Sequence, residues 1–317
     1  MITSSGFILG GAVGGTIAAT MIPAFGWSSV FVAGAVAPLM LGLVMIVAMP
    51  ESLQFLALQR RRVDRVRRWL VRIDPALKIN AATEFVVPEK KKQGAPFMHL
   101  FRAGMGTGTA LLWAVNFMNL LVAYFLANWL PVIITEAGHG ISQAVWAATI
   151  FWVGGMAGNL LLGWFVDRRG FGPTLALTFL TAAVMIALIG QVASSMLLAC
   201  LAIVATGFCV LGGQTALNAL AAEYYPTSVR STGMGWALGI GRMGSIFGPV
   251  IGGELMRLNW KAADLFFAAS VPALLALLAI ALFWRSGSLP LAAAKRAAAT
   301  PDSAPAAGLK VETHLHA

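Results

Sequence analysis

Eight long apolar stretches run through the sequence, and each is about as long as a helix that spans a membrane. A spanning helix needs roughly 20 mostly apolar residues to cross the hydrocarbon core of a bilayer. The stretches cover residues 2–22, 28–49, 107–134, 142–166, 174–193, 196–221, 232–255 and 262–284. Hydrophobic residues make up 59% of the 317 positions and charged residues only 11%, a balance that a soluble domain would not tolerate on its surface. The sequence therefore predicts an all-α, polytopic membrane protein inserted in a lipid bilayer.

The net charge of +10 is distributed unevenly between the connections that join these stretches. The connections on one side, above all residues 51–104, carry most of the lysines and arginines, whereas the opposite connections carry only Arg257 and Lys261. Basic loops stay in the cytoplasm, so we expect a multi-pass protein of a bacterial-type inner (plasma) membrane with a cytoplasmic C-terminus. This topology accounts for the charge, and no nucleic-acid partner is expected.

A glycine-rich pattern occurs twice, at residues 9–15 and at residues 247–253. Small residues allow membrane helices to approach closely, so we interpret both copies as packing motifs. Their contact residues would be Gly10, Gly11, Gly14, Gly15, Gly248, Pro249, Gly252 and Gly253. The first two helices then correspond to the last two in the same orientation, as in transporters built from parallel repeats. Nothing precedes the first copy, so we expect that helices are missing before it.

Two motifs resemble those of the major facilitator superfamily. Residues 163–170 (Gly-Trp-Phe-Val-Asp-Arg-Arg-Gly) resemble its Gly-x-x-x-Asp-Arg-x-Gly loop, and residues 248–253 resemble its glycine-rich packing motif. Within that superfamily, residues 50–52, 225–233 and 239–242 are similar to the aromatic acid:proton symporter family.

The resemblance implies the major facilitator fold, in which twelve helices form two halves of six. About eight transmembrane helices of the expected twelve would be present, and helices one to four would be missing through an N-terminal truncation. Residues 1–50 would then be the last two helices of the N-terminal half, and residues 105–286 the C-terminal six-helix bundle. Residues 51–104 would form a cytoplasmic central loop with an amphipathic helix, and residues 287–317 a disordered cytoplasmic tail.

Arg242 lies in the middle of the apolar stretch 232–255. A charge at the centre of a membrane helix costs about 2.5–3.5 kcal/mol on insertion scales, so it is a functional candidate by default. The functional interpretation is that the planar guanidinium binds the carboxylate of an aromatic acid through two parallel hydrogen bonds. The alternative is a structural arginine paired with backbone carbonyls or with Glu223.

Other candidate contacts for a ligand come from the third and sixth stretches. Asn116 and Asn119 share a helix face because they are three residues apart, and Gln214 and Asn218 share one because they are four apart. Trp113 and Tyr124 lie near the same stripe as the two asparagines. In the superfamily the corresponding helices border a central cavity. The alternative is that these amides only form hydrogen bonds between helices, worth about 0.6 kcal/mol each.

Charged residues at the cytoplasmic ends of the helices are candidates for a gate. The resemblance assigns this role to Asp167, Arg168, Arg169 and Gly170, with Asp167 stabilising the positive end of the helix that starts near Thr3. Glu223 and Arg230 would form a second part of the gate. The alternative is that these charges merely fix the topology of the loops.

The resemblance implies a secondary active transporter, or a fragment of one, that takes up a small aromatic carboxylate with protons by alternating access. 4-Hydroxybenzoate and benzoate are the expected substrates, and the protein is expected to act as a monomer. The alternatives are a major facilitator transporter of a sugar, dicarboxylate or drug, or a transport-inactive membrane remnant. No arrangement of serine, histidine, cysteine and aspartate fits catalysis, so no enzyme activity, cofactor or metal is expected.

Overall fold

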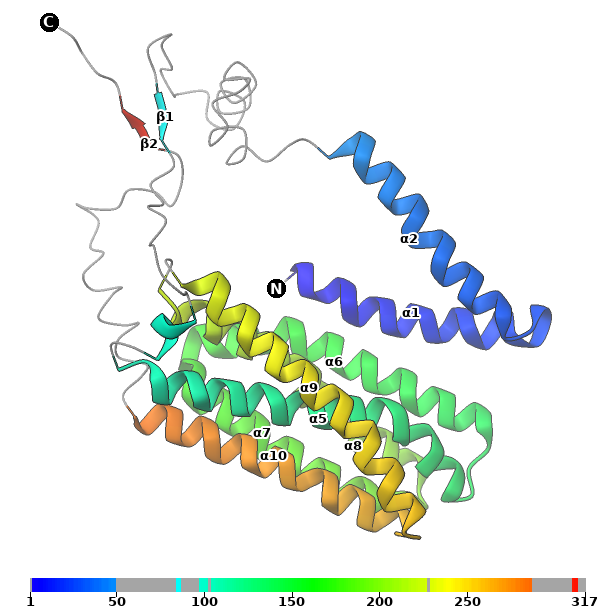
Figure 1. Ribbon diagram of the computed structural model, residues 1–317. Coiled ribbons are helices and arrows are strands. Elements are labelled where there is room, and N and C mark those ends of the chain that lie inside the picture. The colour runs from blue at the N-terminus through cyan, green and yellow to red at the C-terminus, as the bar shows by residue number, and fades with distance from the viewer. Residues whose placement is uncertain are drawn as a thin grey trace, which may run out of the picture. The chain divides into compact units, whose positions relative to one another are not determined.

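The computed structural model describes residues 2–49, 84–86, 97–101, 104–226, 229–286 and 310–312. Two units are compact by themselves, one formed by residues 1–30 and 94–293 and the other by residues 31–93 and 294–317. The first unit contains most of the helices and is called the helical bundle below (Figure 1).

All eight apolar stretches are helices, which confirms the predicted fold class. They are α1 (Ile2–Phe25), α2 (Ser28–Ala48), α5 (Gly106–Glu136), α6 (Ile141–Arg169), α7 (Phe171–Val192), α8 (Met196–Tyr224), α9 (Arg230–Arg257) and α10 (Ala262–Arg285). Among the described residues, six of these helices (α2, α5, α6, α7, α8 and α10) are long and apolar enough to cross a membrane. The glycines and Arg242 make α9 less apolar than its neighbours.

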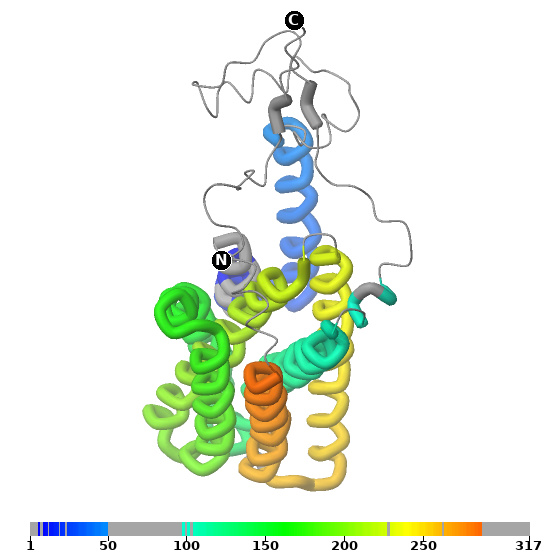
Figure 2. Tube along the Cα trace, turned by 90° about the vertical axis from the view of Figure 1, so that its left-hand side faces the viewer, coloured from blue at the N-terminus to red at the C-terminus, as the bar shows by residue number. Residues whose placement is uncertain are grey.

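Three pairs of helices make the most extensive contacts in the bundle: α6 with α8, α5 with α9, and α7 with α10. Figure 1 shows α5 and α9 side by side, and Figure 2 shows α10, in orange, beside the green α7. Buried side chains such as Phe151, Phe179 and Phe266 fill the space between the helices. The bundle therefore has a packed apolar interior.

Glycines bring two of these helix pairs into backbone contact. On α6, Gly158 faces the carbonyl group of Phe208 on α8, and on α9, Gly244 and Gly248 face the carbonyl groups of Phe117 and Leu121 on α5. A Cβ atom at any of these positions would overlap the neighbouring backbone. The glycines thus set the distance between helices, as is usual in membrane bundles.

The two copies of the predicted packing motif differ in their surroundings. In the second copy, Gly248 and Gly252 are buried, and the Pro249 carbonyl accepts a 3.0 Å hydrogen bond from Trp129 Nε1. A Cβ atom at Gly253 would be in ordinary contact with Trp129. In the first copy, a Cβ atom at Gly11 would overlap the ring of Trp152 on α6, and one at Gly15 would lie 4.0 Å from Thr149 Oγ1. A Cβ atom at Gly10 or Gly14 would meet no described residue outside its own helix within 4 Å.

The second unit contains α2 and a small antiparallel pair of strands. Strand β1 (Glu84–Val86) pairs with β2 (Lys310–Glu312), with Phe85 opposite Val311. Strand β2 lies within the predicted tail 287–317. The amphipathic helix predicted within residues 51–104 lies outside the described residues, which in this loop are β1, a 3₁₀ turn (η1, Met98–Leu100) and the residues beside that turn.

Candidate functional site

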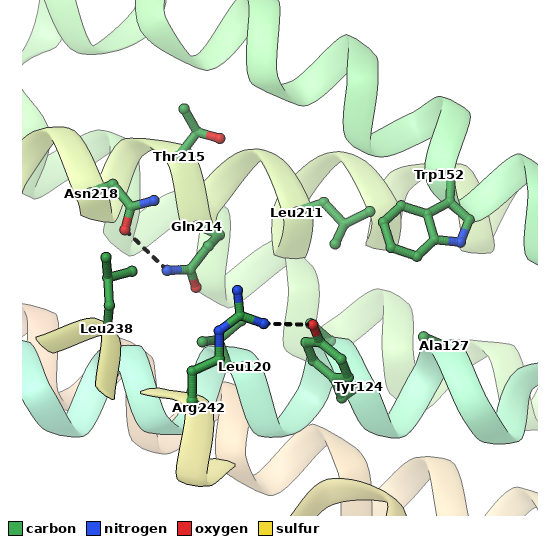
Figure 3. A pocket seen from close by; sticks show the side chains of 11 residues that line it. Leu120, Tyr124, Ala127, Trp152, Leu211, Gln214, Thr215, Asn218, Leu238 and Arg242 are labelled. Carbon is green, nitrogen blue, oxygen red and sulfur yellow. Dashed lines mark hydrogen bonds between the residues drawn. The ribbon is translucent and has the colours of Figure 1, made fainter. Parts of the chain in front are cut away.

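A cavity of about 430 Å³ opens in the helical bundle near the middle of α5, α8 and α9 (Figure 3). Its wall is formed by Leu120, Ala123, Tyr124, Ala127, Trp152, Leu211, Gln214, Thr215, Asn218, Leu238 and Arg242. The residues from α5 and from α8 recur at spacings of three and four, which places each set on one face of its helix. The wall is mostly apolar, with polar groups gathered at a few points.

Arg242 projects from α9 into this cavity and contacts α5. Its Nη1 donates a 2.9 Å hydrogen bond to the hydroxyl oxygen of Tyr124, and the side chain is otherwise exposed. Within the part of the chain that the structure describes, the remaining N–H groups of the guanidinium donate no hydrogen bond. The Tyr124 hydroxyl still has its own proton to donate. The pair therefore presents several hydrogen-bond donors and one positive charge to the cavity.

Three amides connect α5 and α8 behind the cavity wall. Gln214 Nε2 donates to Asn116 Oδ1 at 3.0 Å, and Asn119 Nδ2 donates to Gln214 Oε1 at 2.9 Å. Both asparagines are almost fully buried, at 1% and 2% exposure, and neither belongs to the cavity wall. Of the four predicted amides, Gln214 and Asn218 line the cavity, while Asn116 and Asn119 hold Gln214 in place.

The two buried asparagines are also anchored to main-chain carbonyls. Asn116 Nδ2 donates to the Leu112 carbonyl at 2.9 Å, and Asn119 Nδ2 donates to the Val210 carbonyl at 3.1 Å. A carbonyl oxygen can only accept, so each anchor determines which way its amide is turned. The conformation of Gln214 is consequently fixed from both sides.

Asn119→Ala is expected to lower the stability of the bundle by about 1–2 kcal/mol, because hydrogen bonds between membrane helices contribute roughly 0.6 kcal/mol each and reach about 1.7. The substitution removes the donor to both Gln214 and Val210. Thermal unfolding of the purified protein in detergent measures the effect. Asn128→Ala is the matched control, because Asn128 is exposed and, among the described residues, its side chain bonds only to the Tyr124 carbonyl of its own helix. Equal melting temperatures for the two variants would contradict the prediction.

Trp113 lies outside the cavity, although it is on the same helix as Tyr124. Its ring stacks on Trp236 of α9 at 5.8 Å between centroids and meets Phe101 edge-on at 5.5 Å. Phe97 also packs against Trp236, at 4.8 Å. The structure thus places Trp113 in an aromatic cluster at the N-terminal ends of α5 and α9 rather than among the lining residues.

The predicted gate residues lie at the C-terminal ends of α6 and α8 and at the start of α9. Asp167, Arg168 and Arg169 are exposed in the last turn of α6, and Gly170 has a φ of +81° that permits the tight turn into α7. The Arg168 guanidinium lies 4.0 Å from the centroid of the Trp164 ring, a favourable cation–π arrangement.

At the end of α8, Glu223 is partly buried and Arg230 Nε donates to the Tyr225 carbonyl at 3.3 Å. Among the described residues the structure has no ion pair for Asp167. A gating role for either group stays a prediction.

Several lining residues were not predicted from the sequence. Leu120, Leu211 and Thr215 follow from Tyr124 and Gln214 by the spacing of a helix face, so the signal was available. Trp152 lies on α6, where the sequence offered no polar residue as a signal that this helix lines the cavity. Leu238 lies one turn before Arg242 and shares its face.

The fold and the cavity define a polytopic helical protein with a small cavity between its helices. The chain belongs to the Major Facilitator Superfamily, whose sequence profile matches residues 112–312. This confirms the resemblance found in the motifs.

Relatives carry the names of transporters for aromatic acids. The chain is 40% identical over 273 residues to the 4-hydroxybenzoate transporter PcaK of Pseudomonas putida, an alignment that covers 86% of this chain and 61% of that protein. It is 40% identical over 286 residues to PcaK of Acinetobacter baylyi, covering 89% and 62%. It is 38% identical over 280 residues to a gallate transporter of Pseudomonas putida, covering 88% and 62%. The chain therefore spans about 61% of the length of such relatives.

Proposed function

We propose that the cavity binds a small aromatic carboxylate and that the protein serves as a secondary transporter for such acids. The observation that carries the proposal is the Arg242–Tyr124 pair, which presents unused donors and a positive charge to an otherwise apolar cavity. A guanidinium matches a carboxylate through two parallel hydrogen bonds. The names of the relatives, which include 4-hydroxybenzoate and benzoate transporters, agree with this ligand class.

The size and walls of the cavity also support a single-ring acid. Sites for small molecules have volumes of roughly 300–1,000 Å³ with mostly apolar walls, and this cavity, at about 430 Å³, is at the small end of that range. Leu120, Leu211, Leu238 and Trp152 provide apolar surface for a ring. A neutral sugar would leave the charge of Arg242 without a counter-ion, so the cavity favours an anion.

The remaining parts of the proposal concern how the protein works in the cell. We assign it to the inner membrane with its C-terminus in the cytoplasm, because the basic loops lie on one side. Proton-coupled uptake by a monomer is supported by the resemblance to proton symporters alone, and no carboxylate is assigned to coupling. Asp167 and Arg230, at the ends of α6 and α9, are proposed as parts of a cytoplasmic gate.

A competition experiment tests the ligand class. The purified protein in lipid nanodiscs is expected to bind radiolabelled 4-hydroxybenzoate saturably, because the carboxylate supplies a counter-ion that no described residue gives to Arg242. Unlabelled benzoate should displace it, whereas equal concentrations of glucose or succinate should not. Displacement by glucose or succinate as effective as that by benzoate would refute an aromatic carboxylate site. Failure to bind either aromatic acid would refute the proposal as a whole.

A further inference from the structure

The cavity has a second polar end, formed by Asn218 and Thr215 of α8. Figure 3 shows Asn218 and Tyr124 on opposite sides of the Arg242 side chain. The two α8 residues are three apart, so they lie on one face of the helix, and both line the cavity. Binding of a carboxylate by Arg242 leaves this end without a role.

The hydrogen-bond network determines which group Asn218 presents to the cavity. Two main-chain carbonyls fix Asn116 and Asn119, and these in turn fix Gln214 with its Nε2 group directed toward α5 and Asn218. Gln214 Nε2 donates its second hydrogen bond to Asn218 Oδ1 at 3.2 Å. The Asn218 side chain must therefore be turned with its oxygen toward Gln214. Its Nδ2 group, with two N–H donors, is left for the cavity.

Thr215 supplies the complementary function. The Thr215 hydroxyl makes no hydrogen bond to any described residue. Thr215 is one of the residues that line the cavity. A hydroxyl oxygen accepts as well as donates. Asn218 and Thr215 together therefore offer a donor and an acceptor at neighbouring positions, which is the pair that a single hydroxyl group on a ligand requires.

We infer that Asn218 and Thr215 bind a hydroxyl group on the aromatic ring, at the end of the ligand away from the carboxylate. Asn218 Nδ2 donates to the phenolic oxygen, and the phenolic proton is donated to Thr215 Oγ1. The inference rests on the proposed function, because Arg242 must hold the carboxylate for the ring to be oriented. Leu238, one turn or about 6 Å along α9 from Arg242, adds apolar surface at the Asn218 end of the cavity (Figure 3).

This arrangement predicts selectivity among aromatic acids. A site built to hydrogen-bond a hydroxyl group binds the analogue without it less well, because its buried polar groups are then left unpaired. The protein should therefore bind 4-hydroxybenzoate more tightly than benzoate. Asn218 and Thr215 are specificity-determining residues in this view, whereas Arg242 binds both acids equally.

Asn218→Leu separates this role from general binding. The substitution keeps the branched shape of the side chain but removes the donors, so the affinity for 4-hydroxybenzoate should fall about tenfold. The affinity for benzoate should change less than twofold. Equilibrium binding of both acids to the protein in nanodiscs measures the two dissociation constants. Asn128→Leu is the matched control, because Asn128 is exposed and is not part of the cavity wall; it should leave both constants unchanged.

Thr215→Val provides an independent variant in case Asn218→Leu disturbs folding, since valine has nearly the shape of threonine without the hydroxyl. It should also reduce the preference for 4-hydroxybenzoate and leave benzoate binding intact. The inference is overturned if folded variants keep the wild-type ratio of the two constants, or if they lose affinity for both acids equally. If the variants still bind both acids with an unchanged ratio of dissociation constants, the hydroxyl site is refuted but the proposed function is not. Absence of binding by the wild-type protein would refute the proposed function as well.

Discussion

Arg242→Ala is expected to weaken the binding of benzoate about 10- to 100-fold. Hydrogen bonds to charged groups contribute roughly 1.5–3 kcal/mol, which corresponds to this range. Benzoate is the better probe here because it has no hydroxyl group, so its only polar anchor is the carboxylate. The alanine variant removes the guanidinium and leaves the Tyr124 hydroxyl as the sole donor from this pair. Equilibrium binding to the protein in nanodiscs measures the loss.

Two further variants show whether the effect depends on position and shape. Arg257→Ala is the matched control on the same helix, because Arg257 is exposed in the last turn of α9 and pairs with Glu254 at 2.5 Å. It should bind benzoate as the wild-type protein does. Arg242→Lys keeps the charge but loses the planar fork, and we expect an intermediate affinity. Wild-type affinity in Arg242→Ala, or an equal loss in Arg257→Ala, would remove Arg242 from the site.

The helices could be predicted from the sequence because backbone N–H and C=O groups can form their hydrogen bonds in lipid in very few ways. An apolar stretch of spanning length must form its hydrogen bonds internally, and all eight stretches are helices in the structure. Helix ends were less certain, since α5 begins at Gly106 and α6 extends to Arg169, beyond its apolar residues. The pairing of β1 with β2 had no signal, because three-residue strands carry no periodic pattern.

The cavity could be predicted only in part. Arg242 was recognisable because a charge inside an apolar membrane helix is costly, and Tyr124 because it lies near the helix face of Asn116 and Asn119. The structure brings Arg242 and Tyr124 together. The amides were recognisable as a group, but composition does not say which of them face the cavity. That depends on how α5 and α8 are rotated against each other, which is set by packing between helices. Trp113 illustrates the limit, because it is one turn from Asn116 yet packs in an aromatic cluster.

Gly244→Ala is expected to destabilise the bundle by about 1–3 kcal/mol, the usual cost of overpacking. A Cβ atom at this buried position would overlap the Phe117 carbonyl of α5 and lie 3.1 Å from the Leu121 nitrogen. Main-chain atoms cannot move aside as a flexible side chain does, so α9 must shift away from α5. Arg242 is two residues away on α9 and bonds to Tyr124 on α5, so the same shift should also weaken benzoate binding.

Gly239→Ala on the same helix separates this steric effect from the general effect of replacing a helical glycine. No atom of a described residue lies within 4 Å of a Cβ at Gly239, so only the helix propensity changes, which favours alanine by about 0.8–1.0 kcal/mol. Thermal unfolding in detergent should therefore give a higher melting temperature for Gly239→Ala and a lower one for Gly244→Ala. If both substitutions raise the melting temperature, the close approach of α5 and α9 is not what holds Arg242 in place. If the melting temperature falls but benzoate binding is retained, α9 can shift without separating Arg242 from its ligand.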